Sequence, residues 1–374
     1  MTGWTLKVIK EFFYGNIEIS KLFSMREHPQ VYYIIIVLHV VYYSCIFLIY
    51  LLHKKLNYAY VKMWASWGQY AWLLNKRLFS HQRLNEEHFK KNNLNDNRSS
   101  FEQWLVGFTD GDGNFSITNQ GNKWGVSFKL AQSRYNLRVL NYIKKELGVG
   151  SITKDNNKGQ YFIRNRKLIE SIIIPIFDKY PLLTSKYFDY IKLKKALVIL
   201  NDSSISIEVK NTKLTHIKNS KIPLGYISPA WSSTILPLIN VDSINNVMNK
   251  HWLVGFIEAE GSFYLTNKDS NRIVHGFGLT QKLDSIVLQS IGLILHIKNP
   301  VRYIELYSHY ILDTTNSRAI ENIIDYFKDT MKGVKSLEYK IWARSYKKNK
   351  GNFNKLYEIR NTIRKLRKTL LEIK

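Results

Sequence analysis

The sequence predicts an α+β protein built from two tandem αββαββα repeats, and three observations support this fold class. First, a ten-residue segment occurs twice, as WLVGFTDGDG at 104–113 and WLVGFIEAEG at 252–261. Second, each copy is followed by alternating apolar and polar residues, which predict β-strands. Third, later landmarks in the two halves stay in step to one residue. Such repetition indicates a tandem duplication with a pseudo-twofold axis.

Each copy of the segment predicts a helix with one bare face. Gly107 and Gly111 lie four residues apart in the first copy, as do Gly255 and Ala259 in the second. Residues at this spacing share one side of a helix. The two helices can therefore pack backbone to backbone.

The first predicted helix has a favourable N-terminal end and an unfavourable C-terminal end. Residues 99–103 resemble a capping box in front of a helix that we expect from about Trp104. At the other end, Asp110 and Asp112 lie beside the negative end of the helix dipole, before a Gly113 stop. The second copy repeats this unfavourable end, and a local rule broken twice at corresponding places indicates a functional site.

The last acidic residues of the two copies are Asp112 and Glu260. If the helices bring them together, their charges repel and raise a pKa unless a cation lies between them. Carboxylate oxygens suit a hard cation such as Mg²⁺.

The remaining periodicities predict the same order of elements in both halves. In the first half we expect strands at 115–118 and 126–130, a helix at 136–147, a hairpin at 151–163, and helices at 167–177 and 185–200. In the second half we expect strands within 262–281, a helix at 284–295, strands within 302–314, and helices at 317–331 and 336–346. Gln132 follows Asp112 by 20 residues, and Gln281 follows Glu260 by 21.

These residues resemble the motifs of the single-chain LAGLIDADG homing endonucleases and their intron-maturase relatives. The motifs are 105–113 and 253–261, and the resemblance covers roughly residues 100–350. It implies a monomer whose two four-stranded sheets form a DNA-binding β-saddle around the paired helices, and a β-ribbon fits the DNA major groove.

The resemblance also implies roles for the acidic residues. Asp112 and Glu260 would bind the catalytic divalent metals, Mg²⁺ or Mn²⁺, whereas Asp110 and Glu258 would be residues of the helix ends. The second copy departs from the name-giving pattern because it carries Glu for both Asp.

Four further residues match functional positions of the family. Gln132 and Gln281 match residues that order water near the metal. Lys186 and Lys335 match basic residues that assist water activation or stabilise charge in the transition state, and they follow Asp112 and Glu260 by 74 and 75 residues. The alternative for each is an ordinary surface residue.

Polar residues on the predicted strands are candidates for base and phosphate contact, or else solvated strand residues. They are Ser116, Thr118, Lys129, Tyr264, Thr266 and Lys268.

The composition indicates a polyanionic partner. The 374 residues include 55 Lys and Arg against 29 Asp and Glu, a formal charge of +26. This excess favours nucleic acid or an anionic membrane surface, with a basic surface kept for solubility as the alternative. The single cysteine, Cys45, excludes an intrachain disulfide and a cysteine-rich zinc site. Abundant Asn, Ile, Lys and Tyr are what AT-rich codons yield, which suggests an organelle genome and a mitochondrial protein.

Five regions follow from these patterns. They are a hydrophobic N-terminal region (1–56), a linker (57–100), a first motif domain (101–200), an inter-domain linker (201–250) and a second motif domain with a basic C-terminal helix (251–374). Within the first region, the uncharged run 31–52 is long enough to span a bilayer and would associate the protein with the inner membrane. It could instead be an apolar core helix or a segment removed by processing.

The basic tail also has two interpretations. Leu356, Ile359 and Ile363 fall on one helical face, with Arg360 and Arg364 opposite. The helix could pack through its apolar face with a solvated basic side, or its basic side could also contact the backbone of a nucleic acid.

Three functions remain open. The first is an intron-encoded homing endonuclease that makes a staggered, sequence-specific double-strand break in DNA by metal-dependent hydrolysis. The second is a maturase that binds its group I intron RNA and assists splicing. The third is a membrane protein with a nucleic-acid-binding domain. Reverse-transcriptase signatures and P-loops are absent from the sequence.

Overall fold

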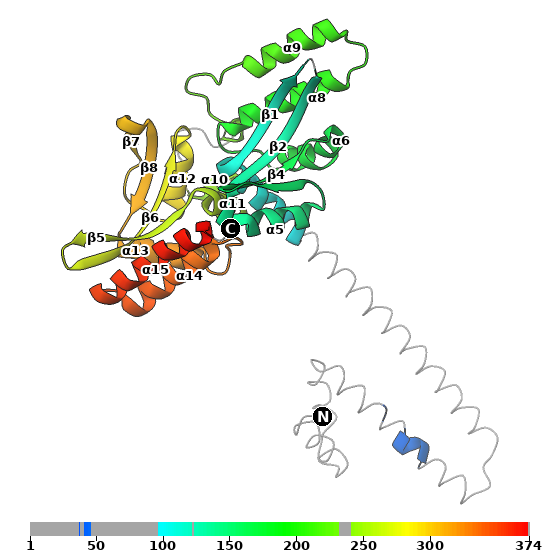
Figure 1. Cartoon of the computed structure of the whole chain (residues 1–374). Helices are drawn as coiled ribbons and strands as arrows, with labels where there is room; N and C mark the ends of the chain where they lie inside the picture. The colour runs from blue at the N-terminus through cyan, green and yellow to red at the C-terminus, as the bar shows by residue number, and fades with distance from the viewer. Residues whose placement is uncertain (1–36, 38–40, 46–95, 122, 232–240, 373–374) are drawn as a thin grey trace, which may run out of the picture. The chain divides into compact units, whose positions relative to one another are not determined.

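The computed structural model describes residues 37, 41–45, 96–121, 123–231 and 241–372 (Figure 1). The chain divides into two compact units, 1–91 and 92–374. The predicted apolar span at 31–52 lies outside the described residues, apart from 37 and 41–45, which are helical. Across the described parts of the chain, no helix combines the length and apolarity needed to cross a bilayer.

The second unit contains two halves with the same order of elements (Figure 1). The first half consists of a helix over 96–112, β1 (Gly113–Gln120), β2 (Lys123–Ser133), η2 (Arg134–Asn136), α5 (Leu137–Leu147), β3 (Ser151–Lys154), β4 (Lys158–Ile163), α6 (Arg166–Leu168), the π-helical η3 (Ile169–Ile173), α7 (Ile174–Lys179) and α8 (Lys186–Asn201). The second half consists of α11 (Lys250–Glu260), β5 (Ser262–Asp269), β6 (Arg272–Gln281), α12 (Ser285–Ile294), β7 (Arg302–Ile304), η5 (Glu305–Tyr307), β8 (His309–Thr314), α13 (Ser317–Tyr326) and α14 (Lys335–Asn349). We call helix 96–112 and α11 the two motif helices.

Each half contains one antiparallel four-stranded sheet. The strand orders are β1-β2-β4-β3 and β5-β6-β8-β7, so the hairpin after each motif helix supplies the edge strand and its neighbour. The predicted αββαββα plan is confirmed, because the two halves repeat the same helix and strand order.

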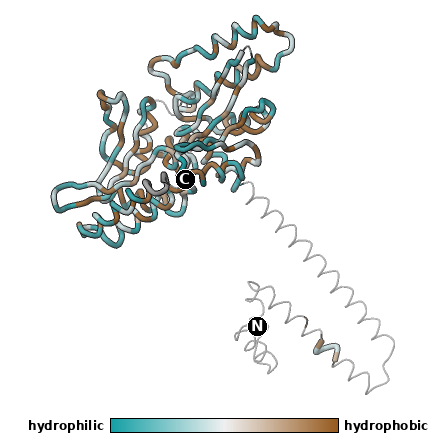
Figure 2. The backbone as a smooth tube through the Cα atoms, viewed as in Figure 1, coloured by the Kyte–Doolittle hydropathy of each residue, from teal (hydrophilic) through white to brown (hydrophobic). Residues whose placement is uncertain are grey.

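Alternation along the strands gives each sheet one buried face. Phe115 in β1 is buried and contacts Phe128 across the sheet and Tyr190 of α8. In the second half, Phe263 packs against Trp342 of α14 in the same way. The helix layer therefore covers one face of each sheet, while residues of opposite parity point to the other face. Figure 2 shows hydrophobic residues concentrated toward the centre of this unit, where the motif helices meet.

The predicted start of the first motif helix near Trp104 is wrong, because residues 96–103 are already helical. Ser99 does not cap the helix, and its hydroxyl instead shares a hydrogen bond of 2.8 Å with the hydroxyl of Tyr180. Arg98 stabilises this extra turn through an ion pair with Glu102, one turn later. These side-chain contacts thus accompany a helical conformation in residues whose local pattern predicts a position before the helix.

The segment expected to be an inter-domain linker is partly helical. It contains α9 (Ile207–Asn219), η4 (Pro229–Trp231) and α10 (Val241–Val247). Trp231 is buried and donates a hydrogen bond of 2.8 Å from its indole to the carbonyl of Leu183. The connection therefore also holds the loop that precedes α8. At the C-terminal end, the predicted basic helix is α15 (Phe353–Glu372), with Leu356 and Ile363 buried. The expected separation of its two faces is incomplete, because Arg360 is partly buried on the same side as Ile363.

Candidate active site

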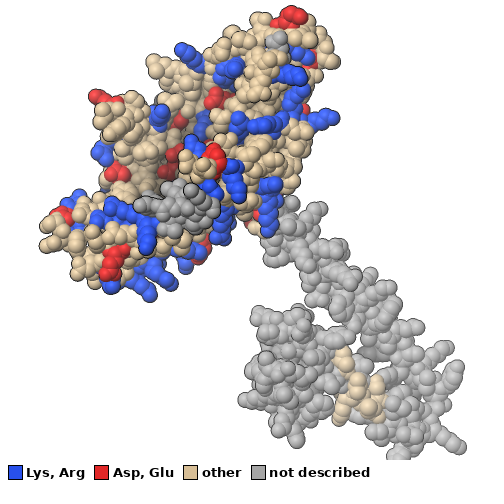
Figure 3. Space-filling model, viewed as in Figure 1, with Lys and Arg blue, Asp and Glu red and all other residues tan. Residues whose placement is uncertain are grey.

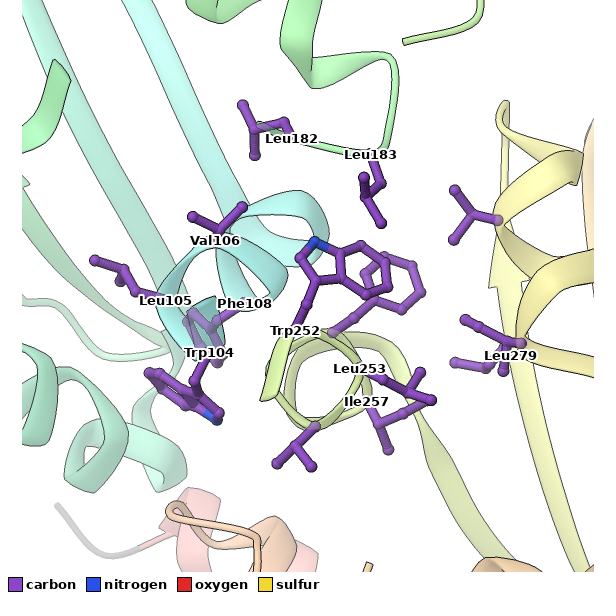
Figure 4. Close-up of a cluster of buried hydrophobic side chains, with 14 of the residues drawn as sticks. Trp104, Leu105, Val106, Phe108, Leu182, Leu183, Trp252, Leu253, Ile257 and Leu279 are labelled. Carbon is purple, nitrogen blue, oxygen red and sulfur yellow. The ribbon is translucent and has the colours of Figure 1, made fainter. Parts of the chain in front are cut away.

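The two motif helices touch through their backbones, as their glycines predict. A Cβ atom added to Gly107 would lie 1.9 Å from the carbonyl oxygen of Trp252, and one added to Gly255 would lie 2.0 Å from that of Trp104. Figure 4 shows Trp252 rising from α11 toward the first motif helix and Leu183. The close approach brings the acidic C-terminal ends of the helices together.

The earlier acidic residue of each motif holds a loop. Buried Asp110 accepts hydrogen bonds from the backbone N–H groups of residues 183 and 184, at 2.8 and 3.0 Å. Buried Glu258 accepts equivalent bonds from residues 332 and 333, at 2.7 and 2.9 Å. Burial raises the pKa of both carboxyl groups, although these hydrogen bonds favour the ionised form. Both acids thereby tie a motif helix to the loop in front of α8 or α14.

Lys186 and Lys335 begin those two helices and reach back to the motif helices. The Nζ atom of Lys186 donates to the carbonyl oxygens of Thr109, at 3.2 Å, and Gly111. The Nζ atom of Lys335 donates to the carbonyl oxygens of residues 257 and 259, at 3.2 and 3.0 Å. Carbonyls at a helix C-terminus lack intrahelical partners and attract cations. Each lysine therefore caps the helix that carries the acid beside it.

The predicted metal ligands Asp112 and Glu260 lie between these lysines. A Cβ atom on Gly111 would lie 3.6 Å from Oε1 of Glu260. Burial raises the pKa of Asp112, and burial together with the negative charge of Asp112 raises the pKa of Glu260. Burial lowers the pKa of Lys186 and of Lys335, against the attraction of the nearby carboxylates. The repulsion predicted for the acidic pair is present and is partly balanced by the amines of these two partly buried lysines.

The two predicted glutamines also reach this site. Gln132 donates a hydrogen bond to Oδ2 of Asp112, and a hydrogen bond from Gln281 favours the ionised form of Glu260. The structure thus brings together all six residues that the family resemblance assigns to the chemistry.

Two residues that the sequence did not single out join the halves. Oδ1 of Asn136 accepts a hydrogen bond of 2.9 Å from the backbone of Val334, while its amide donates to Gln132 at 2.8 Å. In the other direction, Asp284 accepts bonds of 2.8 and 2.9 Å from the backbone N–H and the hydroxyl of Ser185. Each half therefore supports the residue that immediately precedes the lysine of the other half.

The local pattern explains why these contacts escape sequence reasoning. Asn136 and Asp284 are the N-cap residues of α5 and α12, and residues of these types usually bond to the first turn of their own helix. Neither side chain makes a capping bond in this structure. Asp284 also adopts a left-handed backbone conformation with φ of 62°. The sequence pattern alone predicts two ordinary N-caps, and only the structure shows that these side chains bond to the other half instead.

The six predicted DNA-contact residues lie on β1, β2 and β5, in the hairpins that follow the motif helices. Tyr264 and Thr266 alternate with buried Phe263 and Leu265, so they occupy the face opposite the helix layer. Thr118 and Lys268 are exposed near the outer ends of the hairpins, while Ser116 and Lys129 are partly buried. The hydroxyl of Ser116 shares a hydrogen bond of 2.6 Å with that of Ser127.

The donor set at the centre fits a hard divalent cation. Among the described residues, no group of three or more His, Cys, Asp or Glu side chains could hold a metal by itself. The two converging carboxylates, Asp112 and Glu260, supply oxygen ligands. Mg²⁺ commonly takes one or two carboxylates and completes its shell with water and substrate phosphates. Such a cation would also relieve the repulsion between the two acids.

A family model described as LAGLIDADG endonuclease matches residues 105–197 and 253–346 of the chain. The protein belongs to the LAGLIDADG endonuclease family, which confirms the resemblance of its two motifs and implies a DNA endonuclease. The members of this family are generally dependent on divalent metals.

Two curated relatives extend this result. The probable intron-encoded endonuclease Cox1-I1b of Schizosaccharomyces pombe is 43% identical over 280 residues, which span 72% of this chain and 69% of that protein. The uncharacterized mitochondrial protein RF1 of Saccharomyces cerevisiae is 33% identical over 215 residues, 57% of this chain and 41% of that protein.

Solved structures share the fold. The LAGLIDADG homing endonuclease I-GzeII in complex with its DNA target has a TM-score of 0.57 and 28% identity, covering 70% of this chain and 96% of that one. I-SmaMI bound to an uncleaved DNA target in the presence of calcium ions has a TM-score of 0.55 and 26% identity, covering 71% and 97%. These matches favour the endonuclease over the maturase and leave the predicted RNA partner without support.

Proposed function

We propose that this chain is an intron-encoded homing endonuclease that makes a double-strand break at a specific DNA sequence with Mg²⁺, or alternatively Mn²⁺. The observation that carries the proposal is the convergence of Asp112 and Glu260 at the ends of two helices packed backbone to backbone. A partly buried lysine and a glutamine flank each acid. Metal-dependent phosphodiester hydrolysis can use such carboxylates as metal ligands and such lysines as proton-transfer groups.

In this proposal Asp112 and Glu260 hold the divalent cation, with Gln132 fixing the orientation of the Asp112 carboxylate. A cation bound there would lower the pKa of water and would stabilise charge on a phosphate. Lys186 and Lys335 have pKa values lowered by burial, so each amine loses its proton more readily than a solvated lysine. Their carbonyl contacts orient the Nζ atoms, which suits them to accept a proton from water or to face the developing phosphate charge.

The two sheets supply the DNA surface in this proposal. Their free faces carry Tyr264, Thr266 and the other predicted contact residues, and a β-ribbon can enter the major groove. The charge of +26 supplies attraction to the backbone that does not depend on sequence. Two pseudo-symmetric sites in one monomer would cut one strand each. The mitochondrial relative and the composition support a mitochondrial location.

The test is cleavage of a plasmid that carries the ligated exon junction of the host intron. Wild-type protein with Mg²⁺ is compared with Asp112→Asn and Glu260→Gln, which keep the side-chain shapes but remove the charges. We expect a linear product from the wild type and its loss in both variants. A folded wild type that binds the junction without cutting it would contradict the proposal, and cutting that persists in both variants would reject the ligand assignment.

A further inference from the structure

Helix α15 lies along the edge strand of the second sheet and leaves a hollow beside it. The strand order places β5 at the edge, and the hollow has a volume of about 300 Å³. Its lining comes from consecutive residues of β5 and from one side of α15. The lining residues are Phe263, Tyr264, Leu265, Thr266, Arg360, Ile363 and Arg364. Since Tyr264 and Thr266 point to the free sheet face, the hollow borders the surface proposed to bind DNA.

The charge of this hollow is entirely positive. Arg360 and Arg364 are one helical turn apart and therefore project from the same side of α15. None of the described residues that line the hollow is acidic. Figure 3 shows Lys and Arg side chains gathered over this part of the molecule, where α15 lies. A ligand with negative charge would fit this environment better than water or an apolar group.

Arg360 is held in position but keeps an unused donor. Nη1 of Arg360 donates to Oδ1 of Asn267, and its guanidinium carbon lies 4.9 Å from the centre of the Tyr357 ring. Its Nε atom is buried and has no hydrogen-bond partner. A buried donor without a partner is unfavourable, so a shift of this side chain that brings Nε to an acceptor would be favoured.

We propose that Arg360 and Arg364 bind a backbone phosphate of the DNA that lies on the second sheet, so that α15 extends the DNA-binding surface past β5. Guanidinium groups match phosphate oxygens in charge and in the geometry of their donors. Phosphate contacts at the border of a sheet would fix the position of the duplex without reading its sequence. This inference rests on the proposed function.

The first half offers no equivalent arginine pair. Its appended helix α9 follows α8 as α15 follows α14, but its thirteen residues include no arginine. It contacts its sheet through a hydrogen bond of 2.7 Å from the indole of Trp124 to Asn211. The phosphate contact should therefore occur on one side of the target only.

The test compares Arg364→Ala and Arg360→Ala with the control Arg344→Ala. Arg344 is exposed on α14 and does not line the hollow, so the control loses the same charge elsewhere. Affinity for the target duplex and for a scrambled duplex is measured from 50 to about 300 mM salt. Each test variant should weaken both complexes about equally and reduce the slope of log affinity against log salt by about 1. The control should keep the wild-type slope.

A second measurement locates the phosphate. Neutral methylphosphonates are placed one at a time along the target, and the position bound by the arginines should weaken wild-type binding but leave Arg364→Ala unaffected. This position should occur only in the half-site on the second sheet. Wild-type slopes in folded Arg364→Ala and Arg360→Ala, or the absence of such a position, would overturn the inference. If the wild-type protein binds no DNA at all, the proposed function itself fails.

Discussion

The two halves of the molecule share one geometry but differ in their chemistry. In both, a lysine caps the motif helix, and the residue before it bonds to the opposite half. The acceptor in that bond is the neutral amide of Asn136 in one direction and the carboxylate of Asp284 in the other. Burial raises the pKa of Asp284 to about 6, whereas an amide does not titrate. Duplication has thus preserved the hydrogen bonds while making one of the two contacts sensitive to pH.

A second difference concerns the tryptophans that begin the motifs. The indole of Trp252 donates a hydrogen bond of 2.8 Å to buried Asp110. The indole nitrogen of Trp104, at the corresponding position, is buried without a partner. The same residue type therefore supports a buried acid in one half and leaves an unsatisfied donor in the other.

Replacing either Lys186 or Lys335 should abolish most of the activity. We expect Lys186→Met and Lys335→Met each to lower the single-turnover cleavage rate by about 10² to 10⁴, the usual range for proton-transfer groups. Because burial lowers the pKa of both lysines, the wild-type rate should rise with pH to a plateau, and each variant should lose part of that rise. Equal losses would indicate equivalent sites. Wild-type rates in both variants would remove the lysines from the mechanism.

The contact between the two motif helices should be destabilised about equally by a substitution in either helix. Gly107→Ala and Gly255→Ala each drive a Cβ atom to about 2 Å from a backbone carbonyl. Each should lower the free energy of unfolding by about 3 kcal/mol or more, above the common cost of overpacking. Gly292→Ala in α12 is the control, because its nearest neighbour would be 3.6 Å away and alanine favours helix. Chemical denaturation measures all three, and an unaltered Gly107→Ala would contradict the packing.

The contact between Asp284 and Ser185 should give the wild type a distinct pH dependence. Since the folded-state pKa of Asp284 is raised from 3.8 to about 6, the folded state binds more protons between these values. The stabilising contribution is therefore full below about pH 4 and is lost as the pH rises through 6, by at most about 3 kcal/mol. Asp284→Asn, which copies the first half, should flatten this part of the stability profile. If Asp284→Asn kept the wild-type pH dependence of stability, another group would be responsible for it.

The two motif tryptophans, Trp252 and Trp104, should differ slightly in how much their replacement lowers the free energy of unfolding. Trp252→Phe removes a hydrogen bond from buried Asp110 and should destabilise the fold by about 1–3 kcal/mol more than Trp104→Phe, which removes a donor without a partner. Both substitutions lose a similar ring area, so their difference isolates the hydrogen bond. Thermal and chemical unfolding of the pair measure it. Equal losses would show that the bond to Asp110 contributes no net stability.

Much of the fold and the centre of the site could be predicted from local patterns. Strands with alternating burial, such as β1 and β5, have a period of two that needs no knowledge of distant residues. The matched spacing of Asp112 and Lys186 with Glu260 and Lys335 located residues that the structure brings together. The capping pattern predicts a helix start near Trp104 and misses the helical residues 96–103, because contacts with Tyr180 and within the added turn outweigh that pattern.

The duplicated motif, the bare helix faces, the order of strands and helices, and the excess of positive charge can all be read from the amino-acid sequence. These properties depend on the residues themselves or on neighbours within a few positions. Three kinds of contact arise only from tertiary packing: Asn136 and Asp284 support the opposite halves, Trp231 holds the loop before α8, and α15 places two arginines beside β5. The contact between Asn136 and Val334 joins residues 198 positions apart, and that between Asp284 and Ser185 joins residues 99 apart. No local periodicity encodes such pairs, because their geometry exists only after the motif helices have packed.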